Sequence, residues 1–211
     1  MISVYSADSQ VIRKHRDLAT LLLELPEKMH PKALRYRFEK DAFNFVLGRL
    51  LLKRGLKLMN RQDSLQDLNF AENDKPFLPN TYFNISHSGN MVVCALSIDH
   101  PIGIDIEQHD TIELHQFISY FTPKEWLDIN SAENTLQRFY WYWTRKESII
   151  KALGKNLAYL HQIEIDSTQD YFEVEGVQWY LKDIKVSDKF SGSLCAQNRI
   201  SFEHHQLDLL A

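Results

Sequence analysis

The chain has 211 residues, of which 44% are hydrophobic and 25% charged, with a formal net charge of −4 and an isoelectric point near 6.1. This composition is typical of a globular protein and excludes the broad positive field of a generic nucleic-acid binder. We therefore expect no nucleic-acid partner. No uncharged apolar run has the length of a membrane helix and the N-terminus lacks a signal-peptide core, so no membrane partner is expected either. The chain has only two cysteines, which suits a reducing compartment, and a cytoplasmic location is expected.

Two basic clusters come first in the chain, at residues 13–17 and 28–40. Each is consistent either with a solvated helix face or with a local site for the phosphates of a small ligand. The next segment, 40–59, repeats its apolar residues with a helical period. The only cysteines are Cys94 and Cys195, so no disulfide framework or cysteine-based zinc site is predicted.

The rest of the chain predicts a mixed α and β structure. Thr122 suits a helix N-cap, with Pro123 at the first helical position and Glu125 completing a capping box. A long helix is predicted over 134–154, ended by Gly154. A turn is predicted at 86–90. Strands are predicted at 81–85, 91–98, 102–107, 161–166, 178–186 and 192–197.

The two halves of the chain share a short stretch of similar sequence. "SGNMVVCALS" at 88–97 resembles "SGSLCAQN" at 191–198, each with a cysteine before an alanine. An internal repeat with two related halves would explain this similarity. Chance would explain it as well, because the match is short.

The stretch "GIDIE" at 103–107 places two carboxylates in an apolar run. Because alternate residues of a strand share a face, Asp105 and Glu107 point one way while Ile104 and Ile106 can enter the core. Neighbouring carboxylates repel one another, and a hard cation such as Mg²⁺ relieves that repulsion. The other interpretation is a half-exposed strand with a solvated acidic face.

A third acid lies in "WTRKESIIK" at 143–151. Trp143, Glu147 and Lys151 fall on one face of the predicted helix. A glutamate four residues before a lysine is a common surface pair, but the preceding "FYWYW" is too aromatic for a plain solvated face. This face is therefore expected to be partly buried or to line a pocket.

The stretch "FNISHSGN" at 83–90 brings Ser86, His87 and Ser88 to the predicted turn. Their side chains suit hydrogen bonding to a phosphate, with backbone N–H groups assisting. An ordinary turn is the alternative. A nucleophilic Ser/His pair is disfavoured, because such near neighbours in a strand do not face each other properly.

In this order, "NISHSG", "PIGIDIE" and "FYWYWTRKESIIKALGKNL" resemble the 4′-phosphopantetheinyl transferases of the surfactin-synthetase-activating type, in their Lys-Glu-Ser class. "NDKPFLP" at 73–79 is similar to the family's Gly-Lys-Pro segment, with Asp74 in place of the glycine. The resemblance covers roughly residues 73–157.

The resemblance implies an α/β (α+β) fold of two similar halves in a pseudo-two-fold arrangement with the ligand cleft between them. The expected halves are residues 1–100 and 101–211, in a monomer. It also implies an enzyme, a holo-[acyl-carrier-protein] synthase that transfers 4′-phosphopantetheine from coenzyme A to a serine of an acyl or peptidyl carrier protein. Adenosine 3′,5′-bisphosphate is released.

The resemblance also implies roles for particular residues. Asp105, Glu107 and Glu147 would hold Mg²⁺, with Mn²⁺ an equally suitable ion for carboxylate ligands. Glu147, or a metal-bound water that it orients, would be the base, and Lys151 would stabilise or protonate the leaving group. Coenzyme A would be bound by Lys28, Lys32, Arg35, Lys75, Ser86, His87 and Lys151. The family often has a hydroxyl residue near Phe45, and this chain has none at that position.

The carrier protein is implied as a partner, but the sequence does not name it. Because carrier domains are acidic, docking needs a local basic or apolar patch, and "FTPKEWLDI" at 121–129 offers Phe121 and Trp126 beside Lys124. Those aromatics would equally suit a helix packed on the core. Two other functions remain open: an Mg²⁺-dependent pyrophosphate hydrolase acting on nucleotides, and a binder of coenzyme A or carrier proteins without turnover.

Overall fold

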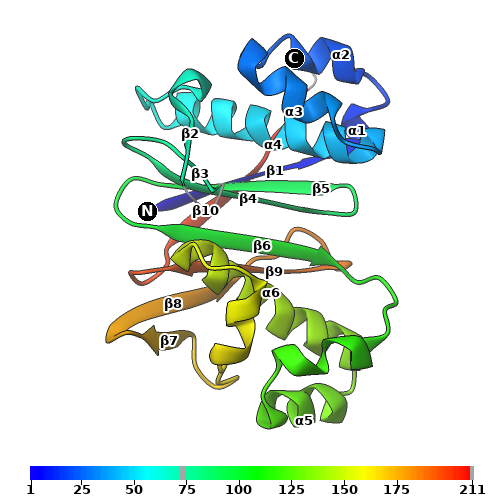
Figure 1. Cartoon of the computed structure of the whole chain (residues 1–211), viewed down its shortest axis with the longest axis vertical. Helices are drawn as coiled ribbons and strands as arrows, with labels where there is room; N and C mark the ends of the chain where they lie inside the picture. The colour runs from blue at the N-terminus through cyan, green and yellow to red at the C-terminus, as the bar shows by residue number, and fades with distance from the viewer. Residues whose placement is uncertain (72–74, 210–211) are drawn as a thin grey trace. The chain divides into compact units, whose positions relative to one another are not determined.

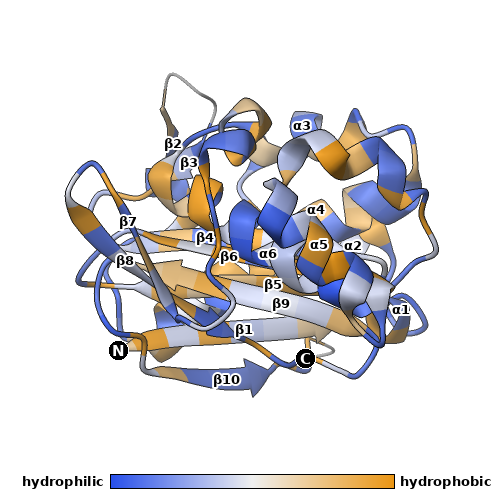
Figure 2. Ribbon diagram, turned by 90° about the horizontal axis from the view of Figure 1, so that it is seen from below, coloured by the Kyte–Doolittle hydropathy of each residue, from blue (hydrophilic) through white to orange (hydrophobic). Residues whose placement is uncertain are grey.

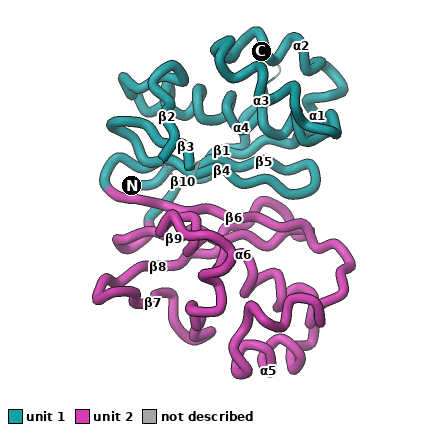
Figure 3. Tube along the Cα trace, viewed as in Figure 1, with its two compact units in different colours: residues 1–99, 201–211 teal, residues 100–200 magenta. Residues whose placement is uncertain are grey.

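The computed structural model describes residues 1–71 and 75–209, and divides the chain into two compact units (Figure 3). The first unit comprises residues 1–99 together with 201–211, and the second comprises residues 100–200. The sequence-based boundary is therefore corrected at the C-terminus, because the strand formed by 202–206 pairs with the first strand of the chain. Asn73 and Asp74 of the segment similar to Gly-Lys-Pro lie outside the described residues.

The first unit contains a four-stranded sheet with the strand order β10-β1-β5-β4 (Figure 1). β10 runs parallel to β1, whereas β5 is antiparallel to both β1 and β4. β10 is largely exposed, and it is hydrophilic over most of its length in Figure 2. The elements of this unit are β1 (Ile2–Asp8), α1 (Ser9–Ile12), α2 (Leu18–Leu22), η1 (Glu27–Met29), α3 (His30–Leu34), α4 (Glu39–Leu58), η2 (Leu65–Asp67), β2 (Asn69–Phe70), β3 (Pro76–Phe77), β4 (Tyr82–Ser88), β5 (Met91–Ser97) and β10 (Phe202–Gln206).

The helix α4 covers this sheet and confirms the helix predicted at 40–59. Its apolar side chains Phe43, Leu47, Leu50 and Leu51 are almost completely buried. At Gly48 the helix comes so close to β4 that a Cβ atom would lie 2.9 Å from a methyl carbon of Ile85. The core of the unit therefore lies between α4 and the sheet.

The hairpin of β4 and β5 has a two-residue turn, Gly89 and Asn90, between the paired residues Ser88 and Met91. Gly89 has φ of 56°, the left-handed conformation that such tight turns require. The predicted turn at 86–90 is therefore wrong for its first three residues, because β4 continues through Ser88. This continuation places Ser86 and His87 on opposite faces of a strand.

The second unit contains another four-stranded sheet, with the order β6-β9-β8-β7 and antiparallel pairing throughout. Cys94 lies in β5, which is antiparallel to its two neighbours, β1 and β4. Cys195 lies in β9, which is likewise antiparallel to its two neighbours, β6 and β8. The elements of this unit are β6 (Ile102–Gln108), η3 (Leu114–Tyr120), α5 (Pro123–Ser131), α6 (Thr135–Leu153), η4 (Leu157–Gln162), β7 (Tyr171–Val174), β8 (Val177–Asp183) and β9 (Phe190–Ala196).

The two predicted helices of this unit are confirmed. Thr122 and Glu125 form the expected capping box at the start of α5, and Gly154, with φ of 68°, caps the end of α6. Phe121 is buried and packs on Phe139 and Trp126, so it belongs to the core and is not a docking residue.

One predicted strand, 161–166, is wrong. Its first two residues belong to η4, and residues 163–166 form irregular chain. Side chains supply part of the hydrogen-bond partners of this backbone. The Lys146 ammonium donates to the carbonyl of Ile163, and the Ile165 amide donates to Glu125 Oε1 over 2.7 Å. Residues that favour strands do not by themselves form one. Here the hydrogen-bond partners of the backbone are side chains, not the backbone of a neighbouring strand.

The strand β6 packs closely against α6. Ile104 and Ile106 are fully buried on one face of β6, while Gly103, Asp105 and Glu107 alternate with them. A Cβ atom at Gly103 would lie 2.0 Å from the carbonyl oxygen of Ser148 on α6, so only glycine fits there. This contact places the acidic face of β6 on the side of α6.

Candidate active site

The acids predicted from the two motifs of the second unit lie close together. Asp105 comes from β6 and is 2% exposed, and its Oδ1 is 2.5 Å from the Lys151 ammonium of α6. Glu147 lies one helical turn before Lys151 on α6, and is partly buried. Glu107, two residues after Asp105, lies on the same face of β6 and is partly exposed. Ile104 and Ile106, on the opposite face of β6, are fully buried and anchor this strand in the core.

The pKa of Glu147 is raised from its usual 4.5 to about 7. Burial is the main cause, and the negative charge of Asp105 adds to it, while the Lys151 ammonium opposes the shift. The carboxyl of Glu147 therefore titrates near neutral pH. A group with this property suits acid–base chemistry.

Lys151 keeps its proton at this site. Burial lowers the pKa of the ammonium, but the charges of Asp105 and Glu147, with the hydrogen bond to Asp105, more than offset it, so the pKa is raised. A fixed positive charge therefore stands within hydrogen-bonding distance of Asp105. Such a charge stabilises an anion that forms beside it.

The chemistry of these donors fits a hard divalent cation, because they are carboxylates whose mutual repulsion a cation would relieve. That repulsion contributes to the raised pKa of Glu147, as the second cause after burial. Within residues 1–71 and 75–209, however, no three His, Cys, Asp or Glu side chains already stand in the arrangement of a metal centre.

Apart from Lys151, the residues predicted to bind coenzyme A lie in the first unit, and the structure brings only some of them together. A cavity of about 220 Å³ beside α4 and β4 contains Lys32 and His87 in its lining. Ser86 is buried on the other face of β4. Lys75 is partly exposed just before β3, and burial lowers the pKa of its ammonium.

The remaining two predicted cations do not line this cavity. The Lys28 ammonium donates to the carbonyl oxygens of Gln66 over 2.5 Å and Leu68 over 3.4 Å. The Arg35 guanidinium donates to the carbonyl of Pro31 over 3.4 Å, and its residue is exposed. Among the three predicted cations of the stretch 28–35, only Lys32 therefore lines the cavity.

Sequence reasoning missed the two buried polar residues of this cavity, Asn44 and Arg49. Both lie on α4 and both are buried, at 2% and 7% exposure. The signal was present in the sequence, because "FNFVLGRLLL" at 43–52 is apolar apart from these two side chains and Gly48. A polar residue within such a run is expected to have a partner or a function.

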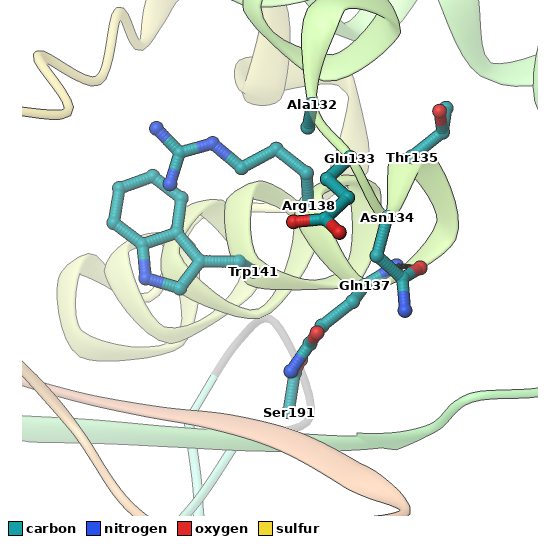
Figure 4. Close-up of a pocket in the computed structure, with 8 residues that line it drawn as sticks. All are labelled: Ala132, Glu133, Asn134, Thr135, Gln137, Arg138, Trp141 and Ser191. Atoms are coloured by element: carbon teal, nitrogen blue, oxygen red, sulfur yellow. Dashed lines mark hydrogen bonds between the residues drawn. The ribbon is translucent and has the colours of Figure 1, made fainter.

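A larger cavity, of about 770 Å³, lies in the second unit beside the start of α6 (Figure 4). Figure 4 shows the Arg138 guanidinium beside the indole of Trp141, and the distance from Cζ to the ring centre is 4.2 Å. The Arg145 guanidinium lies 3.9 Å from the same ring. None of the predicted site residues lines this cavity. Its lining comprises Ala132, Glu133, Asn134, Thr135, Gln137, Arg138, Trp141 and Ser191.

No helix of the described residues is long and apolar enough to span a membrane.

Comparison with known proteins gives concordant matches to both units. The profile of the 4′-phosphopantetheinyl transferase superfamily matches residues 101–200, and that of the 4′-phosphopantetheinyl transferase N-terminal region matches residues 13–99. The 4′-phosphopantetheinyl transferase Sfp of Bacillus subtilis is 37% identical over 190 residues, which cover 81% of each chain.

Two further relatives are similar over shorter regions. The 4′-phosphopantetheinyl transferase gsp of Aneurinibacillus migulanus is 38% identical over 59% of this chain and 54% of its own length. The L-aminoadipate-semialdehyde dehydrogenase-phosphopantetheinyl transferase of Xenopus laevis is 33% identical over 66% of this chain and 53% of its own length. The match thus spans about half the length of these two relatives.

Proposed function

The chain belongs to the 4′-phosphopantetheinyl transferase superfamily, and on that premise we propose that it transfers 4′-phosphopantetheine from coenzyme A to a serine of an acyl or peptidyl carrier protein. The serine oxygen forms a bond to the phosphorus that carries the pantetheine arm. The bond from that phosphorus to the bridging pyrophosphate oxygen breaks, and adenosine 3′,5′-bisphosphate leaves. The observation that carries this proposal is the grouping of Asp105, Glu147 and Lys151, with a glutamate pKa near 7.

Glu147 is the proposed base. A serine hydroxyl is a weak nucleophile and must lose its proton as it attacks phosphorus. A carboxylate with a pKa near 7 accepts that proton better than an ordinary glutamate. The burial of Glu147 and the nearby charge of Asp105, which together raise its pKa, therefore favour its proposed role as a base.

Lys151 is proposed to stabilise the leaving group. Its ammonium stays protonated because Asp105 and Glu147 lie beside it, and a fixed positive charge favours the developing phosphate anion. Asp105 holds the ammonium in place through the 2.5 Å contact, so it acts on the leaving group through Lys151.

Asp105, Glu107 and Glu147 are the residues proposed to hold Mg²⁺. When bound, this ion neutralises charge on the pyrophosphate and on the phosphorus under attack. Lys32 and His87, which share the cavity of the first unit, are proposed to bind coenzyme A phosphates. Lys28, Arg35, Lys75 and Ser86 remain further candidates for this role.

Intact-mass spectrometry of an apo carrier protein tests the proposal. Incubation with this protein, coenzyme A and Mg²⁺ is expected to add one phosphopantetheine group to the carrier, and a chelator should prevent the addition. Coenzyme A consumed without carrier modification would favour the hydrolase. If coenzyme A binds but several carriers and coenzyme A all stay unchanged, the chain is a binder without turnover.

The raised pKa of Glu147 predicts that Mg²⁺ binding depends on pH. Since the ion needs the carboxylate, binding below pH 7 must displace a proton, and the apparent affinity should rise about tenfold from pH 6 to pH 8. Calorimetric titration in buffers of different ionisation enthalpy measures both the affinity and the released proton. Equal affinity at pH 6 and pH 8 would contradict the assignment, and Glu147→Gln should remove the pH dependence.

The same shift has a consequence for stability. The folded chain holds this proton more tightly than the unfolded chain, so Glu147 makes unfolding easier as pH rises from about 4.5 to about 7. Above that range its contribution no longer changes with pH. Bound Mg²⁺ should offset this decrease in the free energy of unfolding, because the cation favours the ionised carboxyl.

A further inference from the structure

The first unit contains a second cavity, which the proposed reaction does not use. Its volume is about 490 Å³, within the range typical of small-molecule sites. It is lined by the chain that follows α2, by the second half of α4 and by the segment around η2 (Figure 1). Among the described residues that line it, none belongs to the proposed reaction or to the proposed coenzyme A site.

The floor of this cavity is aliphatic. Leu25, Leu56 and Leu65 belong to the lining and are between 3% and 5% exposed. Leu23 and Leu58, each next to a lining residue in the sequence, are 82% and 60% exposed. None of the described lining residues is aromatic, so the cavity offers no ring on which a planar ligand could stack. An aliphatic chain is therefore the apolar group that suits it.

Three basic side chains line the same cavity. Lys53 and Lys57 are one turn apart on α4, and Arg61 follows four residues later. The Lys53 ammonium donates to the carbonyl of Glu24 over 2.7 Å, and the Arg61 guanidinium donates to the carbonyl of Asn80 over 3.0 Å. The exposed Lys57 ammonium has no hydrogen bond or ion pair in the described part of the chain. It is therefore available to an anionic ligand.

The two carboxylates of the lining are already engaged. Glu24 forms an ion pair with Arg16 over 2.6 Å, and Asp63 accepts hydrogen bonds from Asn80 over 3.0 Å and from Thr81 over 2.6 Å. With Arg16 included, four basic side chains accompany two carboxylates here, in a chain whose net charge is −4. This local excess of positive charge favours an anionic ligand.

We propose that this cavity binds a free fatty carboxylate, with the hydrocarbon chain against the leucines and the carboxylate at Lys57. The long aliphatic stems of Lys53 and Lys57 add to the surface available to the chain. A group with a single charge matches the one lining ammonium that has no hydrogen bond. The inference is independent of the proposed function, because it uses none of the residues assigned to the reaction.

Calorimetric binding of dodecanoate below its critical micelle concentration tests the inference. Butanoate keeps the carboxylate and shortens the chain, whereas dodecyltrimethylammonium keeps the chain and reverses the charge. Lys57→Glu reverses the charge at the cavity, and Gln66→Trp introduces a bulky side chain at an exposed lining position. Lys40→Glu makes the same charge change at an exposed position of α4 outside the lining, and is the matched control.

We expect wild type and Lys40→Glu to bind dodecanoate equally, and to bind butanoate at least roughly 100-fold more weakly, because most of the buried chain is removed. Dodecyltrimethylammonium should bind more weakly than dodecanoate. Lys57→Glu should weaken dodecanoate binding roughly 10- to 100-fold, since a charged hydrogen bond is lost and a repulsive charge is introduced. Gln66→Trp should weaken it by filling part of the cavity.

Equal binding of dodecanoate by Lys57→Glu and Lys40→Glu would overturn the inference, and so would equal binding of dodecanoate and dodecyltrimethylammonium by wild type. If a variant does not fold, the three ligands decide the matter in wild type. Binding to phosphatidylglycerol vesicles without binding of monomeric dodecanoate would also overturn it, in favour of a membrane contact. Each of these results would leave the proposed function standing, which the carrier assay tests separately.

Discussion

Glu147→Gln is expected to lower the rate of carrier modification by about a thousandfold or more, within the range for loss of a general base. Glutamine has the shape of glutamate but neither accepts a proton at this pH nor supplies a negative charge to a cation. Both proposed roles of Glu147 are therefore lost in one substitution. Single-turnover kinetics with saturating coenzyme A and carrier measure the effect on the chemical step.

The matched control is Glu133→Gln, which removes an exposed carboxylate from the turn before α6 and should modify the carrier at the wild-type rate. Raising the Mg²⁺ concentration separates the two roles. Rescue by excess Mg²⁺ would mean that Glu147 serves mainly as a ligand, whereas a persistent defect is expected if it is the base. A variant within tenfold of wild type would contradict the assignment of Glu147 to the reaction.

Lys146→Met should destabilise the chain by about 3–5 kcal/mol, the range measured when one partner of a buried ion pair is removed. The Lys146 ammonium lies 2.9 Å from Glu125 Oε2, and the two side chains are 0% and 1% exposed. Burial lowers the pKa of Lys146, and Glu125 opposes that shift. Without the lysine, the Glu125 carboxylate would stay buried beside no cation.

Glu125 and Lys146 also join separate segments of the second unit. Glu125 accepts hydrogen bonds from the amides of Thr122 and Ile165, and Lys146 donates to the carbonyls of Leu160 and Ile163. Loss of the lysine should therefore loosen the segment 157–165 as well as the start of α5. Since Lys146 directly precedes Glu147, some loss of activity should follow from displacement of the glutamate.

Urea unfolding of Lys146→Met, Glu125→Gln and the double variant measures the coupling. Glutamine at 125 carries no charge and keeps one oxygen that accepts from one of the two amides. Because neither charge is then left buried alone, the double variant should be more stable than the sum of the single effects predicts. Strictly additive effects would show that the two charges do not stabilise each other. Lys185→Met, in the exposed pair with Asp188, is the control and should unfold like wild type.

The local elements were predictable because their signals are local. The capping box at Thr122 and Glu125, the left-handed stop at Gly154 and the helical period of 40–59 each depend on residues within a few positions of one another. The strand predicted at 161–166 failed for the opposite reason. The partners of its backbone, Lys146 and Glu125, are distant in sequence.

Periodicity alone predicted the acidic site only as separate motifs, and the family resemblance joined them into one site. Strand alternation places Asp105 and Glu107 on one face, and helix periodicity places Glu147 and Lys151 on another. Alternation alone gives no reason to expect that these two faces meet. The contact of β6 with α6 at Gly103 brings Asp105 beside Lys151, and the resulting burial raises the pKa of Glu147.

The sequence by itself therefore determined the mixed α/β class, the order of most elements, the family and the identity of the acids. Tertiary structure alone decided that β10 belongs with the first unit, that Lys146 is a buried partner of Glu125, and that Arg49 lines the same cavity as Lys32 and His87. The physical reason is the range of the interactions. Propensity, capping and periodicity act between near neighbours, whereas burial and the pairing of charges depend on which distant segments the fold brings together.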